Sequence, residues 1–346
     1  MASALVVLVL VVALALAFDY VNGFHDTANA VATVVSTGVL PGRTAVLLAA
    51  VCNFVGAFLS FKVAATIAKD VADPASVTQT VVAATLIGAI AWNLFTWYYG
   101  IPSSSSHALI GGLIGAIWCH RTFAGDAIGE SLWELVSSKG VVKTLKGLVL
   151  SPIAGMFCGF VLMVALTWLV VRLRPTTVNK MFRVLQLVSA SFMAVAHGSN
   201  DAQKAMGIIF MSLGAYAAAQ GEPLDPNAAV PFWVIISCAT AMALGTAAGG
   251  WRIIKTMGHK IIKLRPINGF AAETAAAATI LVAANLGAPV STTHVISSSI
   301  MGVGASKRVS AVKWGVARSM IIAWILTIPV AALVAAGVYG LLRVIL

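Results

Sequence analysis

The stretch Gly23-Phe-His-Asp-Thr-Ala-Asn-Ala30 recurs later in the chain as Gly198-Ser-Asn-Asp-Ala-Gln-Lys-Ala205, with the two aspartates in register. A second pair of motifs follows in the same order, because Gly100-Ile-Pro-Ser-Ser-Ser-Ser-His107 matches Gly287-Ala-Pro-Val-Ser-Thr-Thr-His294. In both members of this second pair, a proline precedes small hydroxyl residues and a histidine. Self-similarity of this kind indicates an internal duplication. The chain is therefore predicted to contain two copies of one unit.

The two predicted copies divide the chain at a short basic stretch. We expect residues 1–173 to form the first transmembrane repeat, 174–183 a basic cytoplasmic linker and 184–346 the second repeat. Gln79 aligns with Glu273 between the paired motifs, which adds a third match. Each repeat contains five hydrophobic segments, at 3–38, 43–68, 77–99, 103–120 and 145–171 in the first and at 184–213, 230–250, 268–285, 291–303 and 314–342 in the second. An odd number of segments inverts the second repeat relative to the first.

The composition fits a protein that is surrounded by lipid. The 346 residues are 60% hydrophobic and only 10% charged, whereas about a quarter of the residues of a soluble domain are charged. Several apolar runs reach the roughly 18 residues that a membrane-spanning helix needs. The four cysteines lack the paired spacing of a metal cluster or a disulfide framework. We therefore expect a multi-pass protein of the plasma (inner) membrane without a bound cofactor.

The net charge of +11 is distributed unevenly among the connections. Basic residues without any acidic residue occupy the connections 172–183, 251–265 and 304–313. Acidic residues gather instead in 69–76, 121–140 and 214–229. Cytoplasmic connections of membrane proteins are enriched in Lys and Arg. The pattern predicts that both termini lie outside the cell, and it explains the basic charge without a nucleic acid partner.

Two expected segments, 103–120 and 291–303, are shorter than a full crossing and begin after a proline. Interrupted segments at corresponding positions of two repeats point to a transporter binding site between the repeats. We expect each to be a half-helix or hairpin that starts near the middle of the membrane. The first segment of each repeat is expected to break at its polar motif, around Asn22–Asp26 and His197–Asp201. The predicted fold is an all-α polytopic membrane protein with two inverted-topology repeats, broken helices and half-helix or hairpin segments.

Hydroxyl side chains follow the proline of each short segment. They are Ser104, Ser105 and Ser106 in the first repeat and Ser291, Thr292 and Thr293 in the second. The first N–H groups of a helix have no helical acceptor, and together with the helix dipole they favour an anion. Hydroxyl groups add donors without adding charge, so a bound anion can be released again. The pattern predicts an oxyanion site; close helix packing by small residues is the alternative explanation.

Further polar residues inside the predicted segments are candidates for coupling to a cation or a proton. They are Asp26, Asp201, Glu273, His25 and Lys204. Ionisable residues within a membrane are costly and mark functional sites by default. Lys204 follows Asp201 by one helical turn, so it either neutralises this carboxylate or meets the anion. Asp26 and Asp201 are also the candidate metal ligands, whereas Asp19 has no matching acid in the second repeat.

At these motifs the sequence resembles the inorganic phosphate transporter (PiT) family, whose signature contains a Gly-x-x-Asp-x-x-Asn core in each half. Gly23, Asp26 and Asn29 match this core fully, and the resemblance extends over essentially the whole chain. The motifs and the short linker look especially like the bacterial low-affinity Pit branch. The resemblance implies an inverted-repeat fold, inorganic phosphate bound between the two halves, and symport with a cation.

On this resemblance, the six hydroxyl residues are expected to hold phosphate, with Asn29 and Gln203 completing the shell. The buried carboxylates would repel a bare phosphate dianion, so the anion and its cation must bind together. Two departures favour a proton over sodium: His25 stands where sodium-coupled members have Asn, and Lys204 replaces the second Asn of the signature. The prediction is proton-coupled phosphate import, with transport of a neutral divalent metal–phosphate complex as an option and sodium coupling as the alternative.

Other functions would use the same residues. A sulfate permease of the same fold would need the same hydroxyl-lined helix starts. An intramembrane hydrolase is disfavoured, because the sequence contains neither a Gly-x-Ser-x-Gly elbow nor a His-Glu-x-x-His pair. An ion channel fits less well, since carboxylates beside anion donors suit stoichiometric symport. No enzyme activity is expected, and the sequence leaves the existence of a homo-oligomer open.

Overall fold

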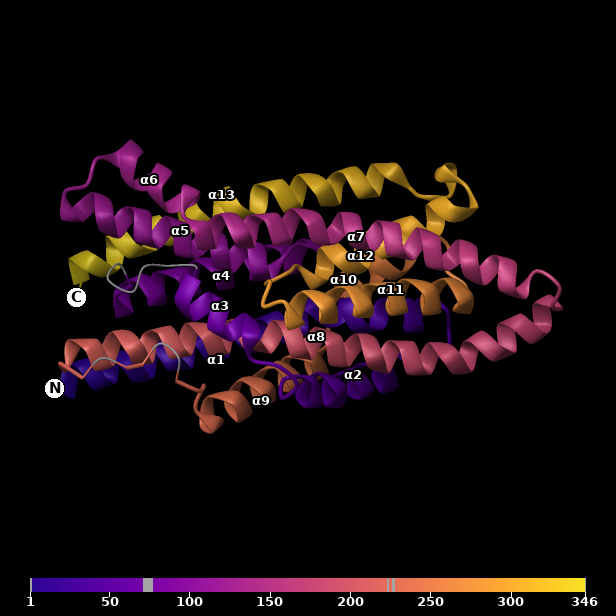
Figure 1. Cartoon of the computed structure of the whole chain (residues 1–346), viewed down its shortest axis with the longest axis horizontal. Helices are drawn as coiled ribbons and strands as arrows, with labels where there is room; N and C mark the ends of the chain where they lie inside the picture. Colours follow the sequence, from indigo (N-terminus) through magenta and orange to yellow (C-terminus); the bar gives the residue numbers. More distant parts are fainter. Residues whose placement is uncertain (1, 71–76, 223, 226–227, 346) are drawn as a thin grey trace.

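The computed structural model describes residues 2–70, 77–222, 224–225 and 228–345, and these residues form helices and connections. Long helices lie side by side in an elongated bundle (Figure 1). Six described helices are long and apolar enough to cross a membrane, namely α1 (Ala2–Ser36), α4 (Gln79–Tyr99), α7 (Lys139–Val170), α8 (Pro175–Ala219), α11 (Pro266–Asn285) and α13 (Trp314–Ile345). The predicted all-α, multi-pass fold is confirmed.

Corresponding long helices of the two halves run in opposite directions. Helix α1 begins at the end of the molecule where both termini lie, whereas α8 begins at the opposite end, after the connection 171–174 (Figure 1). The last helices of the two halves, α7 and α13, are likewise antiparallel (Figure 1). This is the arrangement expected of an inverted duplication.

Helices α5 (Ser105–Ala124) and α12 (Thr292–Lys307) begin at the two Pro-hydroxyl motifs, as expected. Gly100 and Gly287 turn the chain before each of them, with φ of 64° and 66°, a backbone conformation that favours glycine. The hydroxyl of Ser104 then accepts from the backbone N–H of His107 at 3.1 Å, which caps the start of α5. Ser291 caps α12 through His294 in the same way, at 3.2 Å.

The predicted break in the first segment of each half is wrong. Helices α1 and α8 run without interruption through Asn22–Asp26 and His197–Asp201. Neither stretch contains a proline, and the helical backbone remains continuous. Polar side chains such as His25 and Asp26 bond instead to neighbouring helices. Polar residues in a membrane therefore do not by themselves break a helix; proline or a glycine turn is the usual cause.

The helix breaks fall in the second segment of each half instead. Helices α2 (Gly42–Gly56) and α3 (Lys62–Asp70) are separated by residues 57–61. Helix α9 (Phe232–Ala248) and the helical stretch Trp251–Lys260, which comprises α10 (Trp251–Lys255) and the π-helix Thr256–Lys260, meet at 60°. Gly249 at this bend has φ of 74°. If the bent pair counts as one span, the described residues contain seven candidate spans.

The stretch 174–183, predicted as a linker, belongs mostly to a helix. Helix α8 begins at Pro175, which suits the first position of a helix because its missing N–H needs no acceptor there. The acidic connection 121–140 contains the short helix α6 (Ile128–Ser137). Parts of the other two acidic connections, residues 71–76 with Asp73 and residues 223, 226 and 227, lie outside the described residues.

Each half is completed by helices of the other half. Helix α5 packs along α13, and its counterpart α12 packs along α7. A Cβ atom at Gly115 would collide with the carbonyl group of Ala332 across the first pair, and one at Gly159 with that of Ser299 across the second. Small residues thus bring these backbones into direct contact, as is typical of helix pairs in membranes.

Candidate functional site

The starts of α5 and α12 meet the middle of α1 at Asp26. The hydroxyl of Ser105 donates to Asp26 Oδ2 at 3.0 Å, and the hydroxyl of Thr293 lies 3.3 Å from Asp26 Oδ1. The Nδ1 atom of His25 lies 2.6 Å from the same Oδ1 atom. One carboxylate therefore contacts both short helices, which lie far apart in the sequence.

The carboxylate of Asp201 on α8 has a different set of partners. Lys204 Nζ lies 2.6 Å from Asp201 Oδ1, and Asn200 donates to the same oxygen at 2.8 Å. The hydroxyl of Thr292 at the start of α12 donates to Asp201 Oδ2 at 3.2 Å. A charge-assisted bond between two buried groups is among the strong hydrogen bonds of proteins. Lys204 thus lies at ion-pair distance from the carboxylate, which is one of the two partners expected for it.

Asn29 joins α1 to the start of α12. Its side-chain Nδ2 atom donates to the hydroxyl groups of Thr292 at 3.2 Å and Thr293 at 3.0 Å. Asn29 lies three residues after Asp26, so one face of α1 presents both an amide and a carboxylate to the short helices. The predicted neighbours Asp26, Asn29, Thr292 and Thr293 thus lie together.

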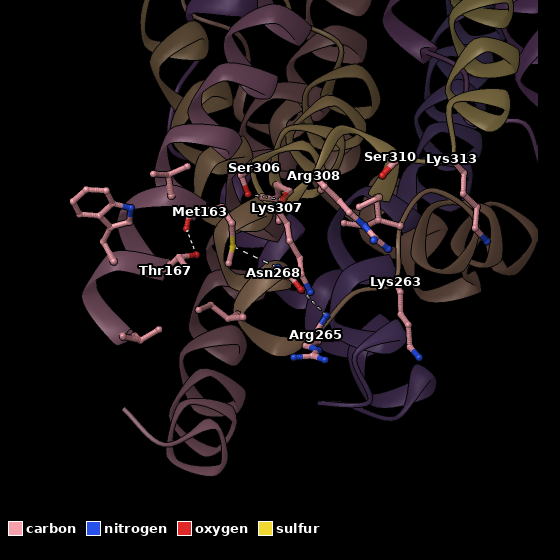
Figure 2. Close-up of a pocket in the computed structure, with 18 residues that line it drawn as sticks. Met163, Thr167, Lys263, Arg265, Asn268, Ser306, Lys307, Arg308, Ser310 and Lys313 are labelled. Carbon is pink, nitrogen blue, oxygen red and sulfur yellow. Dashed lines mark hydrogen bonds between the residues drawn. The ribbon is translucent and has the colours of Figure 1, made fainter. Parts of the chain in front are cut away.

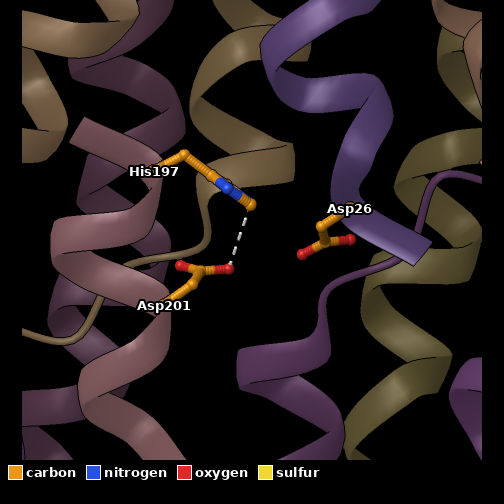
Figure 3. Close-up of side chains that lie close together, drawn as sticks. All are labelled: Asp26, His197 and Asp201. Carbon is orange, nitrogen blue, oxygen red and sulfur yellow. Dashed lines mark ion pairs between the residues drawn. The ribbon is translucent and has the colours of Figure 1, made fainter. Parts of the chain in front are cut away.

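Figure 3 shows Asp26 on α1 facing His197 and Asp201 on α8. One ligand atom from each of the three lies within 4.8 Å of the others, close enough to hold a metal ion. The Nε2 atom of His197 lies 3.5 Å from Asp201 Oδ2. From the sequence, His197 belongs to the polar stretch His197–Asp201 but is not among the predicted metal ligands. Its position four residues before Asp201, on the same helix face, is the signal for that role.

The two helix starts carry backbone donors that no helical bond uses. In α5, Ala108 N–H is the first to close a helical bond, to Ser104 O at 3.0 Å, and the His107 N–H is capped. The N–H groups of Ser105 and Ser106 therefore have no acceptor within the helix. In α12, the first helical bond runs from Val295 N–H to Ser291 O at 3.0 Å. The positive ends of two helix dipoles thus converge on the carboxylates of Asp26 and Asp201, which we call the carboxylate pair.

The predicted site residues are buried. Asp201 is fully buried, Asp26 is 2% exposed, and Ser106, the most exposed of the predicted residues, reaches only 3%. The site is therefore sealed from both ends of the bundle in this conformation. A hydrated ion can enter or leave only after helices move apart.

Glu273, on α11, lies apart from the carboxylate pair. Thr33 donates to Glu273 Oε1 at 2.5 Å and Gln186 donates to the same atom at 3.1 Å. Ser189 donates to the other oxygen. Thr33 is seven residues beyond Asp26, about two helical turns along α1. Glu273 is thus a second, separate acidic site that links α11 to α1 and α8.

Gln203 does not join the cluster. Its Oε1 atom accepts from the backbone N–H groups of Val63 at 2.9 Å and Ala64 at 3.2 Å, and its amide donates to Ser199 O. Gln203 therefore caps the start of α3, and the expectation that it completes the anion shell receives no support from its contacts.

Two further polar features are buried. The rings of His107 and His294 stack with their centroids 4.4 Å apart, one turn into α5 and α12. The two histidines occupy equivalent places in the paired Pro-hydroxyl motifs. Asp19 is fully buried, and both its carboxylate oxygens lack a hydrogen-bond donor of normal geometry among the described residues. It precedes Asp26 by seven residues on the same face of α1.

The profile of the phosphate transporter family matches residues 22–335, which is most of the chain. The chain belongs to this family. A relative from Bacillus subtilis (strain 168), named "Probable low-affinity inorganic phosphate transporter", is 49% identical over 343 residues, covering 99% of this chain and 98% of that protein. One from Rhizobium meliloti (strain 1021) with the same name is 50% identical over 334 residues, covering 96% and 95%. This phosphate transporter family member is thus a transporter rather than an enzyme.

A solved structure entitled "The sodium-dependent phosphate transporter" has the same fold as this family member. The two superpose with a TM-score of 0.81 over 99% of this chain and 100% of the other, at 23% sequence identity. The likeness confirms the all-helical transporter architecture.

Proposed function

We propose that this protein imports inorganic phosphate across the plasma membrane by symport, binding the anion between the starts of α5 and α12. The observation that carries the proposal is the convergence of these two helix starts on Asp26 and Asp201. Membership of the phosphate transporter family names the anion. The division into two repeats, 1–173 and 184–346, gives the site its two related sides.

Phosphate would be bound by the backbone N–H groups of the two helix starts and by hydroxyl groups that now donate to the carboxylates. The hydroxyl of Ser105 donates to Asp26, and that of Thr292 donates to Asp201. A hydroxyl hydrogen can be given to only one acceptor at a time. If a cation takes over at the carboxylates, these hydroxyls become free to turn toward phosphate. Exchange of partners within one cluster would thereby link cation binding to anion binding.

Two cations are proposed to be transported together with phosphate: a divalent metal ion and a proton. The Asp26–His197–Asp201 group suits a divalent ion, since carboxylate and imidazole are common metal ligands and their ligand atoms lie within 4.8 Å. The ion would enter with phosphate as a neutral complex. A proton is proposed to travel on Glu273, which is buried and separate from this group.

Sodium fits the second half of the site less well than a proton does. The ammonium group of Lys204, 2.6 Å from Asp201 Oδ1, already stands beside the carboxylate as a permanent cation. In the first half, His25 Nδ1 lies 2.6 Å from Asp26 Oδ1. Both positions are occupied by nitrogen-bearing side chains, whereas sodium prefers oxygen ligands as other hard cations do.

The purified protein, reconstituted into liposomes, tests the proposal directly. Uptake of labelled phosphate is measured under an imposed proton, sodium or magnesium gradient, and exchange of internal for external phosphate is measured without any gradient. Asp26→Asn and Asp201→Asn are expected to lose both uptake and exchange. Glu273→Gln is expected to keep exchange while losing proton-driven uptake by at least about tenfold, since proton transfer by a positioned group contributes factors of that order or more.

The exposed residue Glu222 provides a matched control. Glu222→Gln removes one carboxylate outside the site and is expected to transport like the unaltered protein. Unaltered rates in Asp26→Asn and Asp201→Asn would remove both residues from the mechanism. Equal loss of exchange and uptake in Glu273→Gln would show that Glu273 does more than carry the proton.

A further inference from the structure

A cavity lies at the end of the molecule where α7 ends. Its volume is about 840 Å³, and it is lined by α7, the start of α11, the end of α12 and the connection 308–313 (Figure 2). None of the residues of the buried anion site lines it. We call it the basic pocket.

Five cationic side chains line the basic pocket. They are Lys263, Arg265, Lys307, Arg308 and Lys313, and no acidic residue is among its lining residues. All five are exposed, and within the described part of the chain none of them forms an ion pair with a carboxylate. Figure 2 shows them coming from separate segments around one hollow. Such a concentration of unpaired positive charge attracts an anion.

The start of α11 adds to this attraction. Arg265 immediately precedes this 20-residue helix, and its backbone N–H donates to the side chain of Asn268 at 3.1 Å. Gly269 N–H is the first to close a helical bond, to Arg265 O at 3.0 Å. The N–H groups of Ile267 and Asn268, both lining residues, therefore precede the helical ladder and favour negative charge.

The wall of the basic pocket that α7 forms is mostly apolar, and it includes one highly exposed tryptophan. It consists of α7 residues that include Met163, Val164 and Trp168. Trp168 is 79% exposed, and the adjacent Leu169 is 76% exposed. In a membrane-spanning helix such side chains face lipid, and Trp is enriched near the interface with water. A small hydrated anion would gain nothing from this wall.

We infer that the basic pocket binds the headgroup of an anionic glycerophospholipid, whose acyl chains lie along α7. The cations would meet the phosphodiester oxygens, and Trp168 would contact the first carbons of the acyl chains. Basic pockets between membrane helices are suited to such headgroups. Bound there, the lipid would join α7 of the first half to α11 and α12 of the second. It would thus support the two helices that carry Glu273 and the hydroxyl-lined start of α12.

The experiment measures lipid binding to the purified full-length protein in detergent. Phosphatidylglycerol or phosphatidylcholine is titrated into the protein, each lipid carrying bromine atoms on its acyl chains that quench tryptophan fluorescence. The Trp168→Phe variant measures how much of the quenching comes from the other tryptophans. Two variants remove equal charge at the same end of the molecule: Lys307→Gln with Arg308→Gln inside the pocket, and Arg172→Gln with Arg174→Gln outside it.

Phosphatidylglycerol is expected to quench Trp168 at lower concentrations than phosphatidylcholine does. The pocket variant should bind phosphatidylglycerol about 30-fold more weakly, as expected for two lost contacts to an anionic headgroup, while the outer variant should bind it normally. If the pocket variant does not fold, as judged by its melting curve in phosphatidylcholine, Lys263→Gln with Arg265→Gln takes its place.

Equal binding by the pocket and outer variants would overturn the inference. Displacement of the brominated lipid by inorganic phosphate at equal concentration would identify a site for the free ion and would also overturn it. Because the readout is binding and not uptake, either result leaves the proposed transport function to its own test.

Discussion

Asp26 and Asp201 occupy equivalent places in the two motifs, yet one residue three positions later makes their surroundings different. After Asp26 this residue is Asn29, which reaches across to the hydroxyls of α12. After Asp201 it is Lys204, which turns back to its own helix and pairs with the aspartate at 2.6 Å. The duplication thus supplies two similar half-sites, and Lys204 gives the carboxylate of the second one a cationic partner that the first does not have.

The substitution Lys204→Asn gives the second motif the asparagine that the first motif has at Asn29. Removing one partner of a buried ion pair costs about 3–5 kcal/mol, so the variant is expected to melt at a lower temperature when no metal cation is present. Sodium or magnesium should restore much of this loss, because the freed carboxylate can then bind the ion. Melting curves of the purified variant with and without each ion provide the measurement.

Lys180 lies on the same helix and is exposed, which makes Lys180→Asn the matched control. It should neither lower the melting temperature appreciably nor introduce a dependence on cations. A Lys204→Asn protein that is as stable as the unaltered one in the absence of cations would contradict the role of Lys204 as the neutralising partner.

At the level of helices, the glycine of each signature motif allows its helix to pack closely against a helix of the other half. A Cβ atom at Gly23 on α1 would overlap the carbonyl oxygen of Met242 on α9. One at Gly198 on α8 would overlap the carbonyl oxygen of Asn53 on α2. Backbone atoms cannot move aside as a flexible side chain can. Each glycine therefore positions the aspartate that follows it three residues later.

Gly198→Ala is expected to destabilise the protein by about 1–3 kcal/mol or more, as overpacking of a well-packed interior does, and to lower transport with it. The matched control is Gly214→Ala in the same helix, where an added Cβ meets nothing within 4 Å. Alanine favours helix over glycine by roughly 0.5–1 kcal/mol, so this variant should be neutral or slightly stabilised. Melting temperatures of the two variants decide the matter; equal values would rule out the close contact at Gly198.

The helices and their order could be predicted from the sequence because membrane spans have strong hydrophobic signals, and Pro102 and Pro289 marked the short helices. The break positions could not be predicted in the same way. Asn22–Asp26 suggested a break by its polarity, but α1 stays intact. The actual bend at Gly249 depends on a glycine turn and on the packing of α9 against α1, which local polarity does not reveal.

The part of the candidate site that is formed by residues of the repeated motifs could be predicted from the sequence. Asp26, Asp201 and the hydroxyls of α5 and α12 meet because both motif pairs are repeated. Gln203 was placed in the same shell because it follows Asp201, but its side chain points to the start of α3. Which face of a helix a residue occupies can be estimated from spacing, whereas the neighbour that it meets depends on tertiary packing.

Across the whole molecule, two basic features lie at the same end of the long axis. The basic connection 171–174 lies at the end opposite to both termini (Figure 1). The basic pocket lies at that same end of α7. Since cytoplasmic connections are enriched in Lys and Arg, we propose that this end faces the cytoplasm and that both termini are external.

Single cysteines in a background without the four native ones test this orientation. Glu222 and Thr176 are both exposed, near opposite ends of α8. Glu222→Cys is expected to react with a membrane-impermeant maleimide in intact cells, and Thr176→Cys only after the membrane is opened. The reverse pattern would invert the proposed topology, and labelling of both from outside would contradict a single crossing by α8.

Helices α5 and α12 each pack against a helix of the other half, and this affects the synthesis of the protein. Helix α5 leaves the ribosome long before α13, the helix that covers it, since residues 125–313 come between them. During this time, the glycine-lined face of α5 lacks its packing partner. It must be covered by lipid or by an insertion factor until synthesis of the chain is almost complete. A first half made alone would remain incomplete, because the binding site also needs Asp201 on α8 and the hydroxyls of α12. The packed face of α5 would be covered only when α13 is inserted.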